Sequence, residues 1–141
     1  MKLSRKMFTT LLLSLLLFSG FAHAEKQKVV IQVSTDDART QKIALNNAVN
    51  VQKALGMDNV DVEIVAYGPG LGMLTNKSKS AQRISSLAMQ DITFSACANT
   101  MAKMEKKSGK KPVLIEGVTV VPAGVLRIME LQQQGYAYIR P

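Results

Sequence analysis

Apolar positions along the chain follow two alternating patterns. Short runs rich in β-branched residues predict strands, and segments in which apolar residues recur every three or four positions predict helices. The expected strands cover residues 29–33, 60–67, 92–97, 118–121 and 136–139. The expected helices run from the residues after Asp37 to about Leu55, over about 78–90 and about 98–107, and along a face formed by Val125, Ile128, Met129 and Gln132. This alternation predicts an α/β fold in which helices cover both faces of a parallel sheet.

Five strands in a domain of this size fit the flavodoxin-like strand order 2-1-3-4-5. In that order the first and third strands are neighbours, and ligands bind between their carboxyl ends. Cys97 ends the third expected strand, and Ser34–Asp37 follow the first. The sequence therefore predicts that the single thiol lies in the crevice where this architecture places its chemistry.

Residues 1–24 have the pattern of a secretory signal peptide. Three basic residues lie among the first six, an apolar segment covers 11–18, and Ala22-His23-Ala24 forms a small-x-small cleavage site. An uncleaved membrane anchor is the alternative, but a spanning helix needs about 20 apolar residues and this run ends at Ser19-Gly20. No Cys directly follows the apolar segment to carry a lipid. We therefore expect a periplasmic domain of residues 25–141 without a stable membrane anchor.

Cleavage changes the chemistry that remains. The 141 residues contain 18 Lys and Arg, 10 Asp and Glu, one His and one Cys. The signal peptide removes three of the basic residues and His23, which leaves a net charge of +5. Without imidazole the mature chain has no Ser-His-Asp or Cys-His catalysis and no His-ligated zinc, so His-dependent hydrolases are excluded. A single Cys also excludes a disulfide within one chain.

The basic charge does not indicate nucleic-acid binding. The aromatic residues of the mature chain are Tyr67, Phe94, Tyr136 and Tyr138. They are not interleaved with the lysines as a nucleic-acid-binding surface would require. The lysines at 106, 107, 110 and 111 are most simply a solvated surface.

Cys97 is the one conventional nucleophile that needs no histidine. A helix is expected to begin directly after it, so the unpaired amides of Asn99, Thr100 or Met101 face the sulfur. Such a position favours the thiolate and lowers the pKa of a thiol. The alternative is a small buried apolar residue that closes a strand, as free cysteine often is.

Three other patterns have weaker chemical interpretations. Gly68-Pro69-Gly70-Leu71-Gly72 lacks the G-x-G-x-x-G spacing of a phosphate loop, and its proline removes an N–H donor; we expect a tight surface loop that covers the crevice. Cys97, Met101 and Met104 offer soft ligands for Cu(I), but methionines also fill space between helix and sheet. Asp36-Asp37 is a hard-cation site or, more simply, a helix cap. We expect no metal site.

Four segments of the mature chain carry a family resemblance. They are Tyr67-Gly68-Pro69-Gly70, Phe94-Ser95-Ala96-Cys97-Ala98-Asn99-Thr100-Met101, Val120-Val121-Pro122-Ala123-Gly124-Val125 and the stretch 131–141, LQQQGYAYIRP. Together they resemble the DsrE/DsrF-like family, over Val29 to Pro141. The resemblance implies a small flavodoxin-like domain that forms homo- or hetero-oligomers, often trimers or hexamers. It also implies sulfane sulfur carried as a cysteine persulfide, and Cys97 stands where the family's acceptor cysteine follows the third strand.

The residues and the resemblance together predict a periplasmic sulfur carrier with sulfurtransferase-like chemistry. Cys97 is the expected nucleophile, which accepts sulfane sulfur and passes it to a partner thiol, with no cofactor. The residues expected to bind the substrate are Thr35, Gly68, Gly70, Asn99 and Thr100. The expected partners are further copies of the chain and sulfur donor and acceptor proteins. The alternative is a non-catalytic binding or assembly module in which Cys97 is buried.

Overall fold

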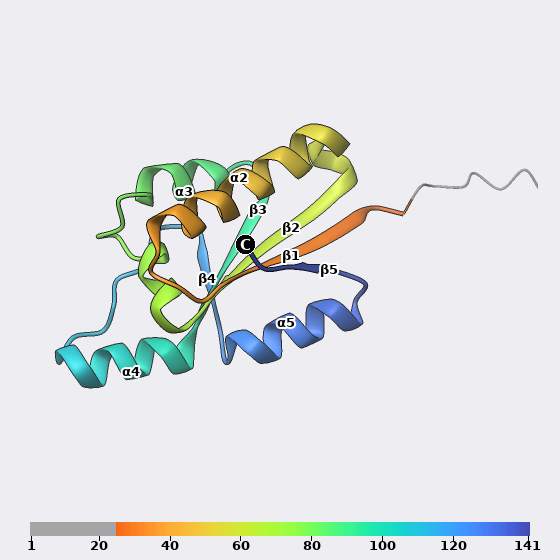
Figure 1. Ribbon diagram of the computed structural model, residues 1–141. Coiled ribbons are helices and arrows are strands. Elements are labelled where there is room, and N and C mark those ends of the chain that lie inside the picture. Colours follow the sequence, from red (N-terminus) through yellow and green to blue (C-terminus); the bar gives the residue numbers. More distant parts are fainter. Residues whose placement is uncertain (1–24) are drawn as a thin grey trace, which may run out of the picture.

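Strands and helices alternate along the computed structural model, which describes residues 25–141 (Figure 1). The strands are β1 (Gln27–Val33), β2 (Val60–Ala66), β3 (Ile92–Cys97), β4 (Val118–Val121) and β5 (Ala137–Ile139). The helices are α2 (Ala38–Leu55), α3 (Ala81–Ala88), α4 (Ala98–Ser108) and α5 (Gly124–Gln133), with 3-10 helices η2 (Met57–Asn59) and η3 (Gly68–Leu74). The predicted signal peptide and His23 lie outside the described residues. Among residues 25–141, no helix has both the length and the apolar composition that crossing a membrane requires.

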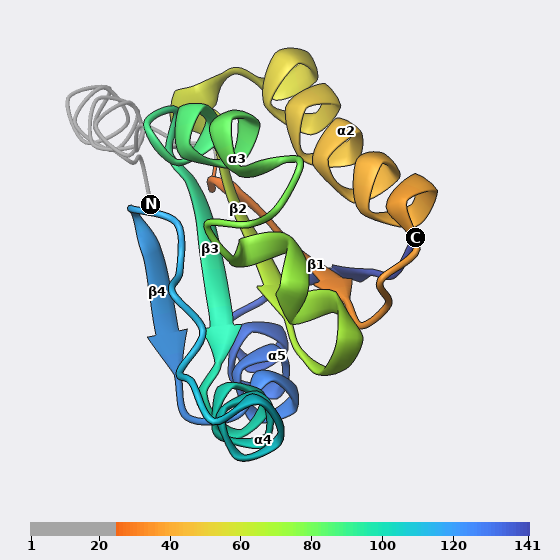
Figure 2. The ribbon, with the colours of Figure 1, turned by 90° about the vertical axis from the view of Figure 1, so that its left-hand side faces the viewer.

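All five strands lie in one sheet, and every neighbouring pair is parallel. Helices α2 and α3 cover one face of the sheet and α5 covers the other (Figures 1 and 2). Helix α4 continues from the end of β3 and contacts β3 and η3. The predicted α/β class, with a parallel sheet between helices, is confirmed.

The order of the strands is β4-β3-β2-β1-β5, which corrects the predicted order 2-1-3-4-5. Strand β2 lies between β1 and β3, so the first and third strands are not neighbours. The chain moves one strand at a time in a single direction from β1 to β4, and α5 then returns it to the far side of β1. Both orders are compatible with right-handed crossovers, so the alternation of elements does not choose between them.

The sheet separates two cores of unequal size. The larger core lies under α2 and α3 and contains Ile31, Ile64 and Phe94, all fully buried. The smaller one lies under α5 and is formed by Val30, Val65, Ile128 and Leu131. Because β1 contributes to both, its residues 29–33 are all buried, as expected for a strand covered on both faces.

The side of α5 that packs against the sheet differs from the predicted side, which contained Val125 and Met129. Its buried residues are Gly124, Ile128 and Leu131, whereas Val125 and Met129 are about half exposed. The helix has apolar residues on two sides, so periodicity alone did not identify the buried side. The side that faces solvent therefore remains apolar.

The start of α2 is capped as the sequence predicts. The Oδ1 atom of Asp37 accepts a hydrogen bond of 2.7 Å from the N–H of Thr40. This bond lowers the pKa of the Asp37 carboxyl below its usual value. The carboxylate thus acts as the N-cap that the alternative interpretation of Asp36-Asp37 assigned to it.

Candidate functional site

Cys97 lies where β3 ends and α4 begins, and it is the N-cap residue of α4. Its backbone pairs with Val121 of the edge strand β4. The side chain is buried, with 5% of its surface exposed. The predicted junction of strand, thiol and helix is therefore present.

Four polar groups lie near enough to the sulfur of Cys97 to affect its pKa. They are the hydroxyl of Thr100 and the backbone N–H groups of Gly124, Thr100 and Asn99. The Cys97 side chain makes no capping hydrogen bond to α4, and the N–H of Asn99 donates to the carbonyl oxygen of Pro122 at 3.4 Å. Burial raises the pKa of the Cys97 thiol, but the four polar groups together lower it by more, and the net pKa lies below its ordinary value. N–H and O–H groups next to an acid favour its charged form. The site therefore stabilises a thiolate.

The hydroxyl of Thr100 is oriented by a second hydrogen bond. It accepts a bond of 3.0 Å from the N–H of Gly68, at the start of η3. Because the lone pair is engaged in this way, the hydroxyl proton is available to the sulfur of Cys97. Chains of hydrogen bonds polarise one another, so Gly68 acts on the sulfur through Thr100. Three of the predicted site residues, Gly68, Asn99 and Thr100, are thus linked to Cys97.

Gly124 brings the N-terminus of a second helix to the same sulfur. It is the first residue of α5, and its N–H lies near the sulfur and lowers the thiol pKa. A Cβ atom at this position would lie 2.9 Å from Cδ1 of Tyr67, so the ring occupies the space that a side chain would need. The sulfur of Cys97 therefore lies close to the first turns of both α4 and α5, where helices concentrate unpaired donors and partial positive charge.

Gly70 and Thr35 lie near this end of the sheet but have other contacts. A Cβ atom at Gly70 would lie 2.3 Å from the carbonyl oxygen of Val33, so glycine lets η3 approach the end of β1. Thr35 accepts a hydrogen bond from the N–H of Asp37 at the start of α2. The grouping of Thr35 with Cys97 depended on β1 and β3 being neighbours, and β2 separates them.

The segment 68–74 is a 3-10 helix and not the expected surface loop. Four of its residues are buried: Gly70, Leu71, Met73 and Leu74. The apolar residues after the glycines hold the segment in the core, which fixes the N–H of Gly68 in front of Thr100. A hollow of about 430 Å³ lies between η3 and α4, lined in part by Tyr67, Thr100 and Met104.

The comparisons with known proteins identify the family. The DsrE/DsrF-like family matches residues 27–141. The chain belongs to the DsrE/DsrF-like family. Its fold matches the solved structure of MTH1491 from Methanobacterium thermoautotrophicum, a protein of unknown function, with 34% sequence identity and a TM-score of 0.74 over 82% of this chain and 100% of that one.

A second solved structure shares the fold. BT1422 from Bacteroides thetaiotaomicron, a conserved protein of unknown function, matches with a TM-score of 0.59 and 17% identity over 82% of this chain and 95% of that one. No protein with curated annotation matches. The family resemblance read from the sequence is confirmed.

The methionines after Cys97 pack within this DsrE/DsrF-like domain. Met101 belongs to the larger core, and Met104 packs against that core. Cys97 caps α4 from outside the helix. Met101 and Met104 therefore fill space between helix and sheet, which was the alternative to their being ligands of Cu(I).

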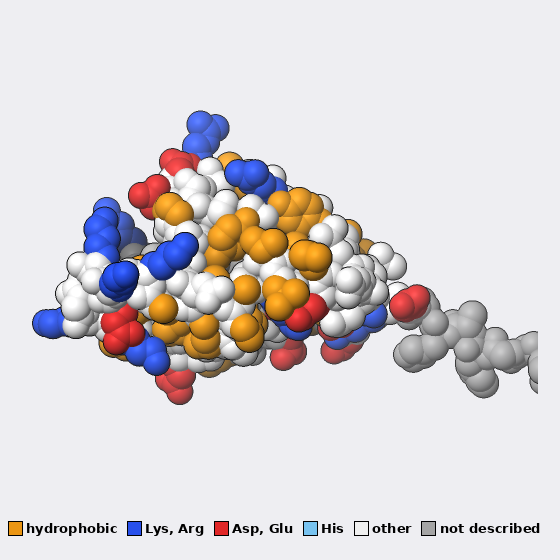
Figure 3. Space-filling model, turned by 90° about the horizontal axis from the view of Figure 1, so that it is seen from below, with side chains coloured by type: hydrophobic (Ala, Val, Ile, Leu, Met, Phe, Trp, Pro, Cys, Tyr) orange, Lys and Arg blue, Asp and Glu red, His pale blue; other side chains and the backbone are white. Residues whose placement is uncertain are grey.

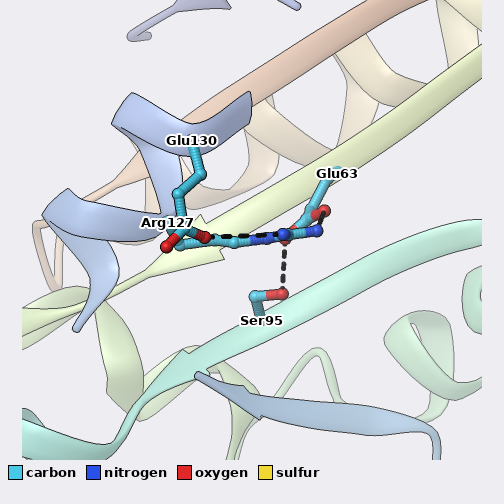
Figure 4. A network of polar contacts seen from close by, with 4 residues as sticks. All are labelled: Glu63, Ser95, Arg127 and Glu130. Carbon is cyan, nitrogen blue, oxygen red and sulfur yellow. Dashed lines mark hydrogen bonds and ion pairs between the residues drawn. The ribbon is translucent and has the colours of Figure 1, made fainter. Parts of the chain in front are cut away.

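A buried ionic network lies on the α5 face of the DsrE/DsrF-like sheet (Figure 4). Arg127 of α5 donates through Nε and Nη2 to the two carboxylate oxygens of Glu63, at 2.8 and 2.7 Å. Ser95 donates to the same carboxylate at 2.6 Å. The side chain of Glu63 is 4% exposed, so its charge depends on these partners.

The sequence analysis did not identify this network. The strands that carry the network, β2 and β3, each have two polar residues, and only Glu63 and Ser95 among them are buried. Buried polar groups require partners. Ser95 precedes Cys97 by two residues on β3, and Arg127 lies one turn after Gly124 on α5, so the network joins the two elements that meet at the sulfur.

Proposed function

We propose that Cys97 is a sulfur carrier of the periplasm, which accepts sulfane sulfur as a persulfide and passes it to a partner thiol. Membership of the DsrE/DsrF-like family supports a role in sulfur relay in general. The observation that carries the proposal is the position of one sulfur beside two helix N-termini, where Thr100, Asn99 and Gly124 lower its pKa.

The chemistry requires only thiols. The Cys97 thiolate attacks the outer sulfur of a donor persulfide, the sulfur–sulfur bond of the donor breaks, and the donor leaves as a thiolate. A partner thiolate then attacks the outer sulfur held on Cys97, and Cys97 leaves as a thiolate. In the first half, the lowered pKa keeps Cys97 in the thiolate form that attacks the donor. In the second half, Cys97 is the leaving group, and a thiolate with a lowered pKa leaves faster.

The second candidate is a binding or assembly module in which Cys97 is structural. It is favoured by the 5% exposure of Cys97 and its place in the larger core. Alkylation of the folded protein at neutral pH distinguishes the two. Rapid labelling is expected for the carrier, and labelling only after denaturation for the structural cysteine.

The direct test of the carrier is an intact mass. The mature protein is incubated with inorganic polysulfide, desalted and weighed, and the carrier is expected to gain sulfur on Cys97. The protein is weighed again after a small thiol is added, which should remove that sulfur. Retention of the original mass under conditions in which the thiol is alkylated would contradict the proposal.

We predict that Thr100→Val slows the reaction of Cys97 at neutral pH by about a factor of ten. A hydrogen bond to a charged group contributes about 1.5–3 kcal/mol, and valine removes the hydroxyl donor. The thiol pKa rises, so the midpoint of the alkylation rate against pH moves to higher pH. Ser108→Ala, which removes a hydroxyl at the exposed far end of α4, is the control and should leave the profile unchanged.

We further propose that the chain self-associates, as a trimer or hexamer, through the outer side of α5. Val125, Leu126 and Met129 are each about half exposed there, and Figure 3 shows hydrophobic side chains gathered on this face of the molecule. Strand β4 adds an edge, and exposed edges need a covering or a partner.

Sedimentation velocity at micromolar concentration is expected to show a closed oligomer. Leu126→Glu should shift it to the monomer, because a carboxylate buried in an apolar contact is strongly unfavourable. Ile43→Glu on α2, an exposed apolar residue on the opposite face, is the matched control. A wild-type protein that sediments only as a monomer would exclude this assembly.

The periplasmic location rests on the predicted signal peptide and leads to a prediction about the N-terminus. Protein recovered from the periplasm is expected to begin at Glu25, because Ala22-His23-Ala24 is a cleavage site of the signal-peptidase type. Edman degradation or terminal peptide mapping reads this residue directly. Exported protein that still begins at Met1 would be incompatible with cleavage.

A further inference from the structure

The positive charge of the domain is concentrated around α4, the helix that begins directly after Cys97. Two segments, 75–80 and 98–113, contain seven lysines and a single acidic residue, Glu105, for a net charge of +6. The rest of residues 25–141 contains eight basic and nine acidic residues, for a net charge of −1. We call these two segments the lysine surface. Its lysines are Lys77, Lys79, Lys103, Lys106, Lys107, Lys110 and Lys111.

The charges of the lysine surface are not neutralised within the described chain. The ion pairs of residues 25–141 engage Lys26, Lys28 and Arg127, and none engages a residue of the lysine surface. Figure 3 shows basic side chains gathered at the end of the molecule where α4 lies. Such a field attracts anionic partners and repels cationic ones.

The lysine surface is concave on both sides of Met104. The hollow of about 430 Å³ next to Thr100 is bordered by Lys103 and Lys107. A second hollow, of about 370 Å³, has Met104, Pro112 and Val113 among its lining residues and is bordered by Lys77, Lys110 and Lys111. Each hollow thus combines apolar lining with a lysine rim. The first also reaches Thr100, whose hydroxyl lowers the pKa of Cys97.

We propose that the lysine surface docks an acidic segment of the protein that exchanges sulfur with Cys97, with an apolar side chain of that segment seated beside Met104. The proposal rests on the proposed function, because it names the chemistry of the partner at the same site. Complementary charge sets the rate and the choice of partner. An apolar side chain in a hollow supplies the anchor that charge alone lacks.

A protein segment fits these features better than a membrane surface does. A bilayer presents a plane of headgroups, whereas hollows accept individual side chains. Cys97 is 5% exposed, and the hollow is lined by Thr100, three residues after it in the chain, so a side chain on a docked segment is placed closer to the sulfur than a flat headgroup layer is. Binding to anionic vesicles is therefore an outcome that the test must separate.

The test compares two short peptides of equal length, each with one Cys activated as a 2-pyridyl disulfide. One carries Asp and Glu around a Leu and the Cys, and the other carries Lys at the acidic positions. The Cys97 thiolate attacks the peptide sulfur, a mixed disulfide forms, and pyridine-2-thiolate leaves and is measured by its absorbance. The acidic peptide is expected to react at least about tenfold faster at low ionic strength.

Salt and substitutions then assign the preference to the lysine surface. The difference in rate should collapse when the ionic strength rises from about 0.01 M to about 1 M, because the Debye length falls from about 30 Å to about 3 Å. The double variant Lys103→Gln/Lys107→Gln should lose most of the difference in rate between the two peptides. The control variant Lys42→Gln/Lys53→Gln removes two exposed lysines of α2 and should retain the full difference in rate.

A binding measurement separates this proposal from the proposed function. Fluorescence anisotropy of a labelled acidic peptide in which Ser replaces Cys reports docking without any thiol chemistry. Binding that depends on Lys103 and Lys107, with no reaction at Cys97, would sustain the docking surface and defeat the carrier. Equal rates for the two peptides, or flotation with phosphatidylglycerol vesicles without binding of the acidic peptide, would overturn the docking surface.

Discussion

Cys97→Ser is expected to abolish the uptake of sulfane sulfur and to leave the fold intact. A serine hydroxyl cannot carry a persulfide, so the loss of sulfur uptake is complete. The fold tolerates the change because the polar groups of Thr100 and Gly124 that lie near the sulfur in the wild type are able to donate to the hydroxyl oxygen. A buried polar group without partners costs about 1–3 kcal/mol, and serine avoids that cost here.

Cys97→Ala provides the matched control for this argument. Alanine leaves no acceptor near the N–H of Gly124 and the hydroxyl and N–H of Thr100, whereas serine provides one. The alanine variant should therefore be less stable than the serine variant, whereas a purely apolar environment would give the opposite ranking. Thermal unfolding of the three proteins measures the ranking, and intact mass after polysulfide treatment measures the uptake. Serine less stable than alanine, together with a wild type that takes up no sulfur, would leave Cys97 as a structural residue.

The sequence predicts those site residues that are close to one another along the chain. Cys97, Asn99 and Thr100 are contiguous, and a strand that runs directly into a helix brings amides to the residue at the junction. Gly124 lies 27 positions after Cys97, and its place beside the sulfur depends on β4 pairing with β3. That pairing is a long-range packing result which no local pattern encodes.

The expected placement of Thr35 beside Cys97 also depended on long-range pairing. The alternation of strands and helices establishes the α/β class because each element shows its own period. The order of the strands depends instead on which strand β3 pairs with. It pairs with β2, and the free side of β1 receives β5. An order with β1 beside β3 would place Thr35 near Cys97, and the observed order places β2 between them.

Apolar pattern also identified the larger core but not the buried polar network. Strand positions that carry Glu63 and Ser95 look like ordinary polar positions of a half-exposed strand. They are buried because α5 covers that face, and the partner that makes their burial tolerable, Arg127, is far away in the sequence. Polar pairs across elements need the tertiary structure to be recognised.

Arg127→Met is expected to lower the free energy of unfolding by about 3 kcal/mol. Removal of one partner leaves the Glu63 carboxylate buried and uncompensated, which costs about 3–5 kcal/mol in comparable pairs. The arginine side chain is 30% exposed, which places the expected value at the lower end. Urea unfolding of wild type and variant measures the difference.

Two further variants determine whether the loss comes from the stranded charge. Glu63→Gln in the Arg127→Met background should recover part of the lost stability, because it removes the uncompensated charge. Lys26→Met breaks an ion pair of 2.6 Å with Asp61 whose side chains are about 40% exposed, and exposed pairs contribute about 0–1 kcal/mol. Equal losses for Arg127→Met and Lys26→Met would show that burial of Glu63 does not set the cost. Arg127 also holds the first turn of α5 against β2 through Glu63, and the N–H of Gly124 in that turn lowers the pKa of Cys97, so the Arg127→Met variant should alkylate with its midpoint at higher pH.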